Sequence, residues 1–271
     1  MIRLAVRVRR EQAELVLAEL LELAPAGVEE RDLGPVVEYA VYGAPGEVPA
    51  LPALRAAAGD ALVEVASQEL PDGWDERWRA FHEPVTVAGR VRVRPPWHAP
   101  AGAGGLVDVV IDPGQAFGTG AHATTRLCLE LLLGLEPGGA LVDVGCGSGV
   151  LAIAAAKVGW APVVGVDHDL EAVRATQANA AANGARVEVR RHDLLRDGPA
   201  PGAPTVVANL LRPLLMRVAA DGFADAPPRA LVAGGLLVHE ADAVAAAFVR
   251  RGLREAARRT DGEWAALLLC A

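Results

Sequence analysis

The 271-residue sequence predicts an α/β protein in which a doubly wound, mostly parallel sheet follows a small α+β domain. Short apolar stretches of strand type alternate with helical stretches over residues 140–252, and this alternation predicts parallel strands with helices on both faces. Residues 1–65 instead show the order strand-helix-strand-strand-helix-strand, which is typical of a ferredoxin-like domain. We therefore expect domains at residues 1–65 and 85–271, joined by a linker helix at residues 66–84.

The composition indicates a folded protein without a membrane span. Hydrophobic residues make up 52% of the chain and the mean hydropathy is +0.26, enough for a large core. The longest apolar runs are much shorter than the roughly 20 residues of a transmembrane helix. The first ten residues alternate in polarity, so no signal peptide is predicted.

Charge and cysteine content exclude several classes of function. The net charge of −8 disfavours a general nucleic-acid surface. Lys157 is the only lysine, so the chain has no G-K-[ST] phosphate loop. Three cysteines without C-x-x-C spacing favour neither a disulfide framework nor a zinc site. We expect a cytoplasmic monomer that binds neither membranes nor nucleic acid directly.

The first domain is expected to serve recognition or packing, because no cluster of catalytic type occurs in it. Residues 2–9 place Leu4, Val6 and Val8 on one side and arginines on the other, as a half-buried strand does. The expected strands are residues 2–9, 27–31, 36–42 and 61–65, and the expected helices are residues 11–23 and 52–58.

The linker carries three aromatic residues at helical spacing, Trp74, Trp78 and Phe81. Such a face either pins the two domains together or contacts substrate, and apolar helix faces usually pack. Strands are then expected over residues 85–93 and 106–111, with a loop rich in proline, glycine and alanine between them.

Three glycines at alternate positions follow a short apolar strand at residues 140–144. Gly145, Gly147 and Gly149 form a G-x-G-x-G turn, and a helix is expected next. Strand, glycine turn and helix in this order let a ligand approach backbone amides at a helix N-terminus. Val150 stands where the dinucleotide-binding pattern G-x-G-x-x-G needs its last glycine. The turn can also serve tight packing alone.

A second dense segment, residues 112–125, precedes the glycine turn. Two glycines flank Thr119, and Thr124 and Thr125 stand where a helix is expected to begin. Hydroxyl groups and free amides at a helix start suit a polar ligand. Thr124 can equally be a plain N-cap, and His122 can either touch a ligand or have a structural role.

Polar side chains follow three of the predicted parallel strands. Asp167 ends the second strand, where an acid accepts hydrogen bonds from both hydroxyls of a bound ribose. Asp193 follows the third strand and either faces an adenine amino group or belongs to a solvated loop. Asn209 ends the fourth strand, at the edge where ligands bind, and its amide needs partners there.

The remaining elements complete a seven-stranded Rossmann-like sheet. Asp169 is expected to cap a helix that Gly184 closes. The last two strands should form an antiparallel hairpin with its turn at residues 260–262. The strands expected for this sheet are residues 140–144, 161–166, 187–190, 205–210, 230–232, 253–259 and 264–270, and the helices placed after the second and fifth strands are residues 170–183 and 240–251.

Together these residues resemble the methyltransferases of ribosomal protein L-eleven (L11), the PrmA family. The most specific part is A-F-G-T-G at residues 116–120 with the following His122, Thr124 and Thr125; D-V-G-C-G-S-G follows at the family's distance. Further matching positions are Trp74, Trp78, Pro96, Trp97, Asn209, Leu210 and Gly262 to Trp264. The chain departs from the family pattern at His168 and Leu170 and in the segment L-L-R-P after Asn209, and residues 1–65 match only in pattern.

The resemblance implies S-adenosylmethionine as cofactor and methyl transfer to lysine side chains and the N-terminal amine of L11, with residues 1–65 holding this substrate. Asn209 and the backbone carbonyl of Leu210 are expected to orient the amine, and no metal is expected. The cofactor contacts implied are Phe117, Gly118, Thr119, Thr124, Thr125, Asp143, Gly145, Gly147, Gly149, Asp167, Asp193 and Asn209.

Two other functions remain open at this point. The chain can methylate another protein or the amine of an RNA base, and fold alone does not separate these substrates. The acidic balance and the lack of a basic cluster with aromatic residues disfavour RNA. Alternatively, the chain can be a non-catalytic module that binds the cofactor or a ribosomal partner. The intact glycines, Asp167 and Asn209 argue against such a loss of activity.

Overall fold

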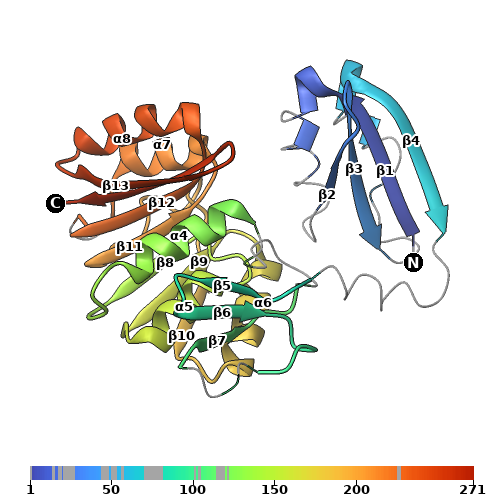
Figure 1. Ribbon diagram of the computed structural model, residues 1–271. Helices are drawn as coiled ribbons and strands as arrows, with labels where there is room; N and C mark the ends of the chain where they lie inside the picture. The colour runs from blue at the N-terminus through green and yellow to red at the C-terminus, as the bar shows by residue number, and fades with distance from the viewer. Residues whose placement is uncertain are drawn as a thin grey trace. The chain divides into compact units, whose positions relative to one another are not determined.

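The computed structural model of the protein divides the chain into two compact units, Met1–Phe81 and His82–Ala271 (Figure 1). The boundary falls inside the predicted linker. Trp74, Trp78 and Phe81 lie outside the described residues, and a helix over residues 70–81 stays a prediction. The predicted helix is wrong at both ends of the linker, because residues 66–69 belong to a strand and residues 82–84 to no regular element. The structure describes residues 2–13, 16–17, 20, 28–43, 49, 54–55, 58–69, 82–100, 102, 105–113, 120, 122–224 and 227–271.

The first unit contains a four-stranded antiparallel sheet in the order β2-β3-β1-β4. This order, with β1 and β3 at the centre, is that of a ferredoxin-like domain, as predicted. Within the two predicted helices, the described residues Ala13, Val16, Leu20, Leu54 and Ala58 are helical and buried. The strands are β1 (Ile2–Arg9), β2 (Glu29–Asp32), β3 (Val36–Gly43) and β4 (Leu62–Glu69), and short 3-10 turns are η1 (Arg10–Gln12) and η2 (Gly59–Ala61). The last strand thus runs past the predicted domain boundary at residue 65.

The two faces of β1 differ as its sequence predicts. Leu4, Val6 and Val8 are buried in the core of this unit. On the other face, Arg3 Nη2 donates to Oε1 of Glu38 at 2.6 Å and Arg7 Nε donates to Oε2 at 2.8 Å. Glu38 is only 3% exposed. The hydrogen bond from Arg3, with a smaller contribution from Arg7, holds the pKa of Glu38 below its ordinary value.

We expect Glu38→Gln to destabilise this unit by about 2 kcal/mol at neutral pH, the loss typical of hydrogen bonds to a charged group. Because the folded pKa of Glu38 is lowered, its contribution is complete above the unfolded pKa and is lost as pH falls through the folded pKa. Native-state hydrogen exchange of β1 amides should therefore show a difference from wild type that narrows below pH 4.5, the ordinary pKa. Glu29→Gln, in an exposed ion pair with Arg31, is the control and should change little. A difference independent of pH would contradict the assignment.

The second unit begins with a small three-stranded sheet of β5 (Val85–Val87), β6 (Val91–Arg94) and β7 (Val107–Val110). The prediction of one strand over residues 85–93 is wrong. The chain reverses between β5 and β6, where Ala88 and Gly89 have φ of 50° and 62°. Two successive residues with positive φ match the twist of a hairpin. The turn was not predicted because Ala-Gly is a weaker turn signal than Asn-Gly and because the valines on both sides continue the alternation expected of a single strand.

The main sheet has seven strands in the order β10-β9-β8-β11-β12-β14-β13. All pairs from β10 to β12 are parallel, and β14 is antiparallel to both of its neighbours. This confirms the predicted doubly wound sheet and its terminal hairpin. The strands are β8 (Leu141–Val144), β9 (Val163–Asp167), β10 (Val187–Arg191), β11 (Thr205–Asn209), β12 (Ala230–Leu237), β13 (Arg254–Asp261) and β14 (Trp264–Cys270).

Helices cover both faces of this sheet (Figure 1). Alternate residues of β11 separate the two cores: Val207 packs with the core of α4 and α5, whereas Val206 and Ala208 pack with that of α7 and α8. No specific helix was predicted at α7. None of the helices within the described residues has the length and hydropathy of a membrane span. The helices are α4 (Ala123–Leu133), α5 (Val150–Val158), α6 (Leu170–Ala182), α7 (Arg212–Asp221) and α8 (Ala241–Val249), and η3 (Val238–Glu240) is a 3-10 turn.

Strand β12 is longer than the predicted residues 230–232. Gly234 and Gly235 lie inside it, and the register with β14 shifts between Ala233 and Leu236. The strand was predicted to end at Val232, but it continues through the glycine pair, which forms a bulge.

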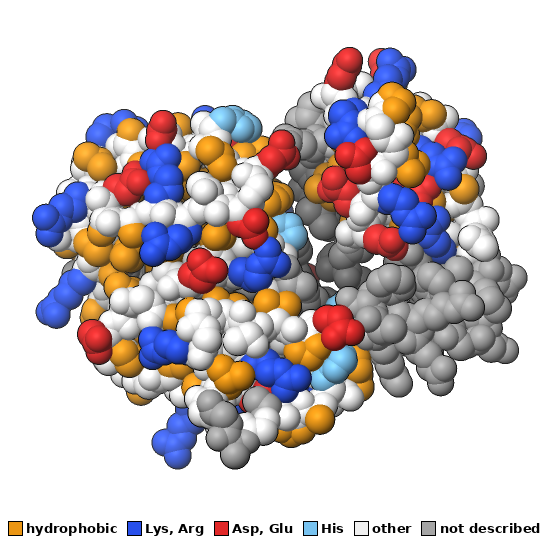
Figure 2. All heavy atoms as spheres, viewed as in Figure 1, with side chains coloured by type: hydrophobic (Ala, Val, Ile, Leu, Met, Phe, Trp, Pro, Cys, Tyr) orange, Lys and Arg blue, Asp and Glu red, His pale blue; other side chains and the backbone are white. Residues whose placement is uncertain are grey.

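Charged side chains of both signs are interspersed on the face of the second unit shown in Figure 2, and the described residues form no extended basic patch there.

Candidate active site at the carboxyl edge of the large sheet

The strand order creates a topological switch point at the centre of the main sheet. β8 and β11 are neighbours, although β9 and β10 lie between them in the sequence on the other side of β8. Ligands of open α/β sheets bind at such a switch point, beyond the carboxyl ends of the strands. Val144 pairs with both Val166 and Ala208, so β8, β9 and β11 end at one level of the sheet. Arg191 at the end of β10 pairs with Asp167 at the end of β9. The structure thus brings the glycine turn, Asp167, Asp193 and Asn209 to one edge.

The glycine turn needs glycine for both conformation and space. Gly145, Gly147 and Gly149 have φ of 77°, 53° and 83°, a left-handed backbone that other residues rarely adopt. A Cβ atom on Gly145 would lie 2.3 Å from Cδ2 of Leu210, and one on Gly149 would lie 2.7 Å from Cγ2 of Thr176. Tight packing therefore explains two of the glycines, and the same turn leads into the N-terminus of α5.

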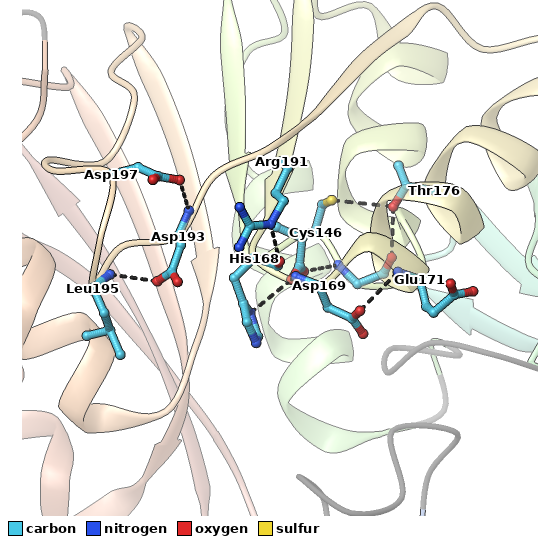
Figure 3. A network of polar contacts seen from close by, with 11 residues as sticks. Cys146, His168, Asp169, Glu171, Thr176, Arg191, Asp193, Leu195 and Asp197 are labelled. Atoms are coloured by element: carbon cyan, nitrogen blue, oxygen red, sulfur yellow. Dashed lines mark hydrogen bonds and ion pairs between the residues drawn. The ribbon is translucent and has the colours of Figure 1, made fainter. Parts of the chain in front are cut away.

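The Asp167 carboxylate is anchored to the turn. Oδ2 accepts from the Gly147 amide at 3.0 Å, and Oδ1 accepts from the Asp169 amide at 3.1 Å. His168 Nδ1 lies 3.3 Å from Oδ1. Figure 3 shows His168 and Asp169 beside this network. A carboxylate has about four acceptor positions, so Asp167 keeps capacity for hydroxyl groups of a ligand. Asp169 caps α6 through the Glu171 amide, as predicted.

Asp193 follows β10 and is 9% exposed. Its Oδ1 accepts from the Leu195 amide at 2.9 Å, its own amide donates to Asp197, and Arg196 lies 3.6 Å from Oδ2. Figure 3 shows Asp193, Leu195 and Asp197 together on one loop. These contacts support a role in the loop, and a contact with adenine stays a prediction. The preceding His192 carries a buried Nε2 without a partner among the described residues, which sequence reasoning did not single out.

Asp143 lies in β8 beneath the glycine turn and is fully buried. Its Oδ2 accepts from the Ala152 amide in the first turn of α5 at 3.1 Å, while Oδ1 has no hydrogen-bond partner among the described residues. Burial raises the pKa of Asp143 to about 7, and the nearby Asp167 adds to the rise. The side chain thus satisfies a helix N-terminal amide, and a direct cofactor contact by Asp143 stays a prediction.

Asn209 is the last residue of β11, and its side chain lies between β12 and α4. Its Nδ2 is 3.5 Å from Oγ1 of the buried Thr125, and its buried Oδ1 has no partner among the described residues. The amide oxygen can therefore accept a hydrogen bond from a ligand donor without giving up a bond to a protein group.

Leu210 crosses the bulge of β12. Its amide donates to the Gly234 carbonyl at 3.1 Å. A Cβ on Gly235, where φ is 77°, would lie 2.5 Å from the Leu210 carbonyl oxygen. The glycine pair therefore allows the close approach of residues 209–210, which sequence reasoning missed although the pair itself is a signal for a bulge.

His122 is the N-cap of α4, so the alternative that Thr124 is a plain N-cap is wrong. Nδ1 of His122 accepts from the Thr124 amide at 3.4 Å and lies 3.3 Å from its hydroxyl group, and the ring packs edge-on against Trp264 at 4.8 Å. Burial and then the charge of Arg126 lower the pKa of His122. Thr124 and Thr125 are buried in the first turn. Phe117, Gly118 and Thr119 lie outside the described residues.

We expect His122→Ala to lower the free energy of unfolding by about 1 kcal/mol through loss of the cap. Asn is also a good N-cap, so His122→Asn should retain most of this stability. Thermal unfolding of both variants checks the role. Equal destabilisation by alanine and asparagine would show that the ring acts through its packing on Trp264 rather than through the cap.

Comparison with known proteins then identifies the family. Residues 52–270 match the family model described as "Ribosomal protein L11 methyltransferase (PrmA)". The chain belongs to this family. The match covers most of the catalytic unit and begins before the end of the first unit.

Similar proteins carry the same name. A ribosomal protein L11 methyltransferase from Geobacter metallireducens is 41% identical over 73% of this chain and 66% of its own length, slightly under two thirds. One from Bordetella parapertussis is 36% identical over 97% of each chain. The crystal structure of a ribosomal protein L11 methylase from Lactobacillus delbrueckii subsp. bulgaricus has a TM-score of 0.62 at 25% identity, covering 69% of this chain and 98% of its own.

S-adenosylmethionine, the cofactor that membership of the PrmA family implies, fits the carboxyl edge. Asp167 keeps acceptor capacity for a ribose, and the left-handed glycine turn offers a close approach to backbone amides. Asn209 adds an amide oxygen without a partner in the described structure. All three features follow the carboxyl ends of neighbouring strands.

Proposed function

We propose that the protein is an S-adenosylmethionine-dependent protein N-methyltransferase. Its substrate is ribosomal protein L11, methylated on lysine side chains and the N-terminal amine. The observation that carries the proposal is the grouping of Asp167, the glycine turn and Asn209 at the switch point of the sheet. The printed names of the relatives support the substrate. We also propose that the protein is a cytoplasmic monomer that does not bind nucleic acid directly.

The cofactor contacts follow from the positions of the edge residues. Asp167 accepts hydrogen bonds from the two ribose hydroxyls, and Asp193 faces the adenine amino group. The turn from Gly145 to Gly149 packs against the methionine part and the ribose. Thr124 and Thr125, together with Phe117, Gly118 and Thr119, complete the site. Asp143 supports it from below through α5.

The methyl donor is already activated as a sulfonium, so the protein's task is alignment and desolvation. An amine attacks only in its neutral form, and a lysine amine has an ordinary pKa of about 10.4. Removal from water disfavours the charged form and favours loss of the proton to solvent before attack. Asn209 Oδ1 and the Leu210 carbonyl then accept the remaining hydrogens and aim the lone pair at the methyl group. No covalent intermediate on the protein is needed.

The first unit has a separate role in this proposal. Residues 1–65 hold the folded protein substrate, and residues 66–84 connect them to the catalytic unit. Two observations support this division of roles. Residues 1–65 contain no cluster of catalytic type in their sequence, and Asp167, the glycine turn and Asn209 all lie in the second unit.

The decisive experiment combines labelled S-adenosylmethionine, the intact protein and a ribosome-rich extract. Label in L11 that is abolished by Gly147→Val supports the proposal, because the larger side chain would block the turn. Label in another protein or in RNA would replace the proposed substrate. If the protein binds S-adenosylhomocysteine but transfers no label from S-adenosylmethionine to any component, a non-catalytic module is favoured instead.

A further inference from the structure

One face of α6 contacts two separate parts of the catalytic unit. Thr176, Asn179 and Asn183 stand three and four residues apart, so they share one side of the helix and its C-cap. Thr176 and Asn179 are only 0% and 5% exposed. Each of the three side chains hydrogen-bonds outside α6, and none of them has a role in the reaction described above.

Two of these side chains hold carbonyl groups of the glycine turn. Thr176 Oγ1 donates to the Gly147 carbonyl at 2.8 Å, and Asn179 Nδ2 donates to the Ser148 carbonyl at 2.9 Å. Figure 3 shows Thr176 directed at this turn beside Cys146. Because a trans peptide points its C=O and N–H in opposite directions, the bond to Gly147 turns the Ser148 N–H away from α6. The hydrogen bond from α6 thereby fixes the direction of the Ser148 amide, which points to the side of the turn opposite the helix.

The same face also holds the chain that leaves β7. Oδ1 of Asn179 accepts from the Asp112 amide at 3.2 Å. The Asn183 amide pairs with both backbone groups of Val110, accepting from its N–H at 2.8 Å and donating to its carbonyl at 2.6 Å. Asp112 opens residues 112–125, the segment with the most specific family resemblance. Asn179 is therefore bonded to this segment's first residue and to the glycine turn.

We propose that Asn179 is a positioning residue for the cofactor: its side-chain amide fixes the glycine turn relative to Asp112 and thereby sets the affinity for S-adenosylmethionine. This inference rests on the proposed function. Both ends of the amide are engaged by backbone groups, so Asn179 acts through the turn. A correctly placed turn serves the ground state and the transition state alike, so loss of Asn179 raises KM for the cofactor and leaves kcat nearly unchanged.

The test compares three variants of the full chain. Asn179→Leu removes both hydrogen bonds at similar volume, and Asn179→Ala removes them with a smaller residue of high helix propensity. Calorimetric titration with S-adenosylhomocysteine should show about 10-fold weaker binding in both, the effect of two lost neutral hydrogen bonds. Asn183→Ala is the matched control. It breaks the bonds to Val110 but no bond to the glycine turn, so it should lower Tm and keep wild-type affinity.

Each outcome has a definite meaning. Weaker binding confined to the Asn179 variants, with kcat preserved at saturating cofactor, supports the positioning role. Wild-type affinity in the Asn179 variants overturns it. An equal loss in Asn183→Ala also overturns it, because general loosening of α6 would then be the cause. Failure of the wild-type protein to bind S-adenosylhomocysteine would overturn the proposed function first and this inference with it.

Discussion

Asp167→Ala should weaken S-adenosylmethionine binding by two to four orders of magnitude. The variant loses two charge-assisted hydrogen bonds to the ribose, each contributing about 1.5–3 kcal/mol, and every 1.4 kcal/mol is about a tenfold change in affinity. It also loses the acceptor for the Gly147 amide, which holds the turn in place. Asp167→Asn keeps one acceptor oxygen and should show a smaller loss. Isothermal titration of each purified protein measures the effect.

The neighbouring Asp169 provides the matched control for Asp167. It is also an acid beside the site, but its side chain accepts from the Glu171 amide and caps α6. Asp169→Ala should therefore lower the free energy of unfolding by about 1 kcal/mol while leaving cofactor affinity close to wild type. Unchanged affinity in Asp167→Ala would remove this residue from the cofactor site.

Asn209→Ala should reduce kcat strongly while S-adenosylhomocysteine affinity stays close to normal. Alignment of the amine matters in the transition state more than in cofactor binding. Loss of one well-placed acceptor should cost about 2–4 kcal/mol by analogy with an oxyanion-hole donor, or roughly 30- to 1000-fold in rate. The unpartnered Oδ1 supports this role, because no protein group in the described structure uses that oxygen.

Single-turnover methyl transfer and melting temperature, measured on the same Asn209 variants, separate the catalytic role from a structural one. Asn209→Asp keeps an acceptor oxygen and should retain more rate than Asn209→Ala. The weak contact with Thr125 offers little stability to lose. A destabilised Asn209→Ala protein with a normal rate constant would show that the residue only completes the strand end.

The fold was predictable where each parallel strand is a buried apolar run that ends in a polar residue. Asp167 and Asn209 mark such ends directly, and three alternating glycines mark the turn between β8 and α5. The hairpin at Ala88 and the bulge at Gly234 were not predicted. In both places the backbone conformation departs from the strand period, while the neighbouring residues keep a strand-like or apolar pattern.

Predictions about the site fail where a role depends on residues far apart in sequence. Asn179 reaches Asp112 across 67 positions, and Asn183 reaches Val110 across 73. In the sequence, Asn179 in α6 and Asn183 at its C-cap are ordinary polar residues, and no local pattern distinguishes them from solvent-facing asparagines. His122 shows the same limit, because its capping role depends on the exact start of α4. Helix starts are less well defined by sequence than helix cores.

The three cysteines are all free thiols, so their alkylation can report local opening of the catalytic unit. Burial raises the pKa values of Cys146, inside the glycine turn, and of Cys128, beside Gly234. Only a thiolate is alkylated readily, so in the native protein these two thiols react when their surroundings open, whereas the partly exposed Cys270 is accessible without such opening. The alkylation rate of Cys146 therefore measures how often the glycine turn opens locally. The alkylation rate of Cys128 measures how often the contact between α4 and β12 opens. Both openings can be followed in the unaltered chain, by mass, without an introduced probe.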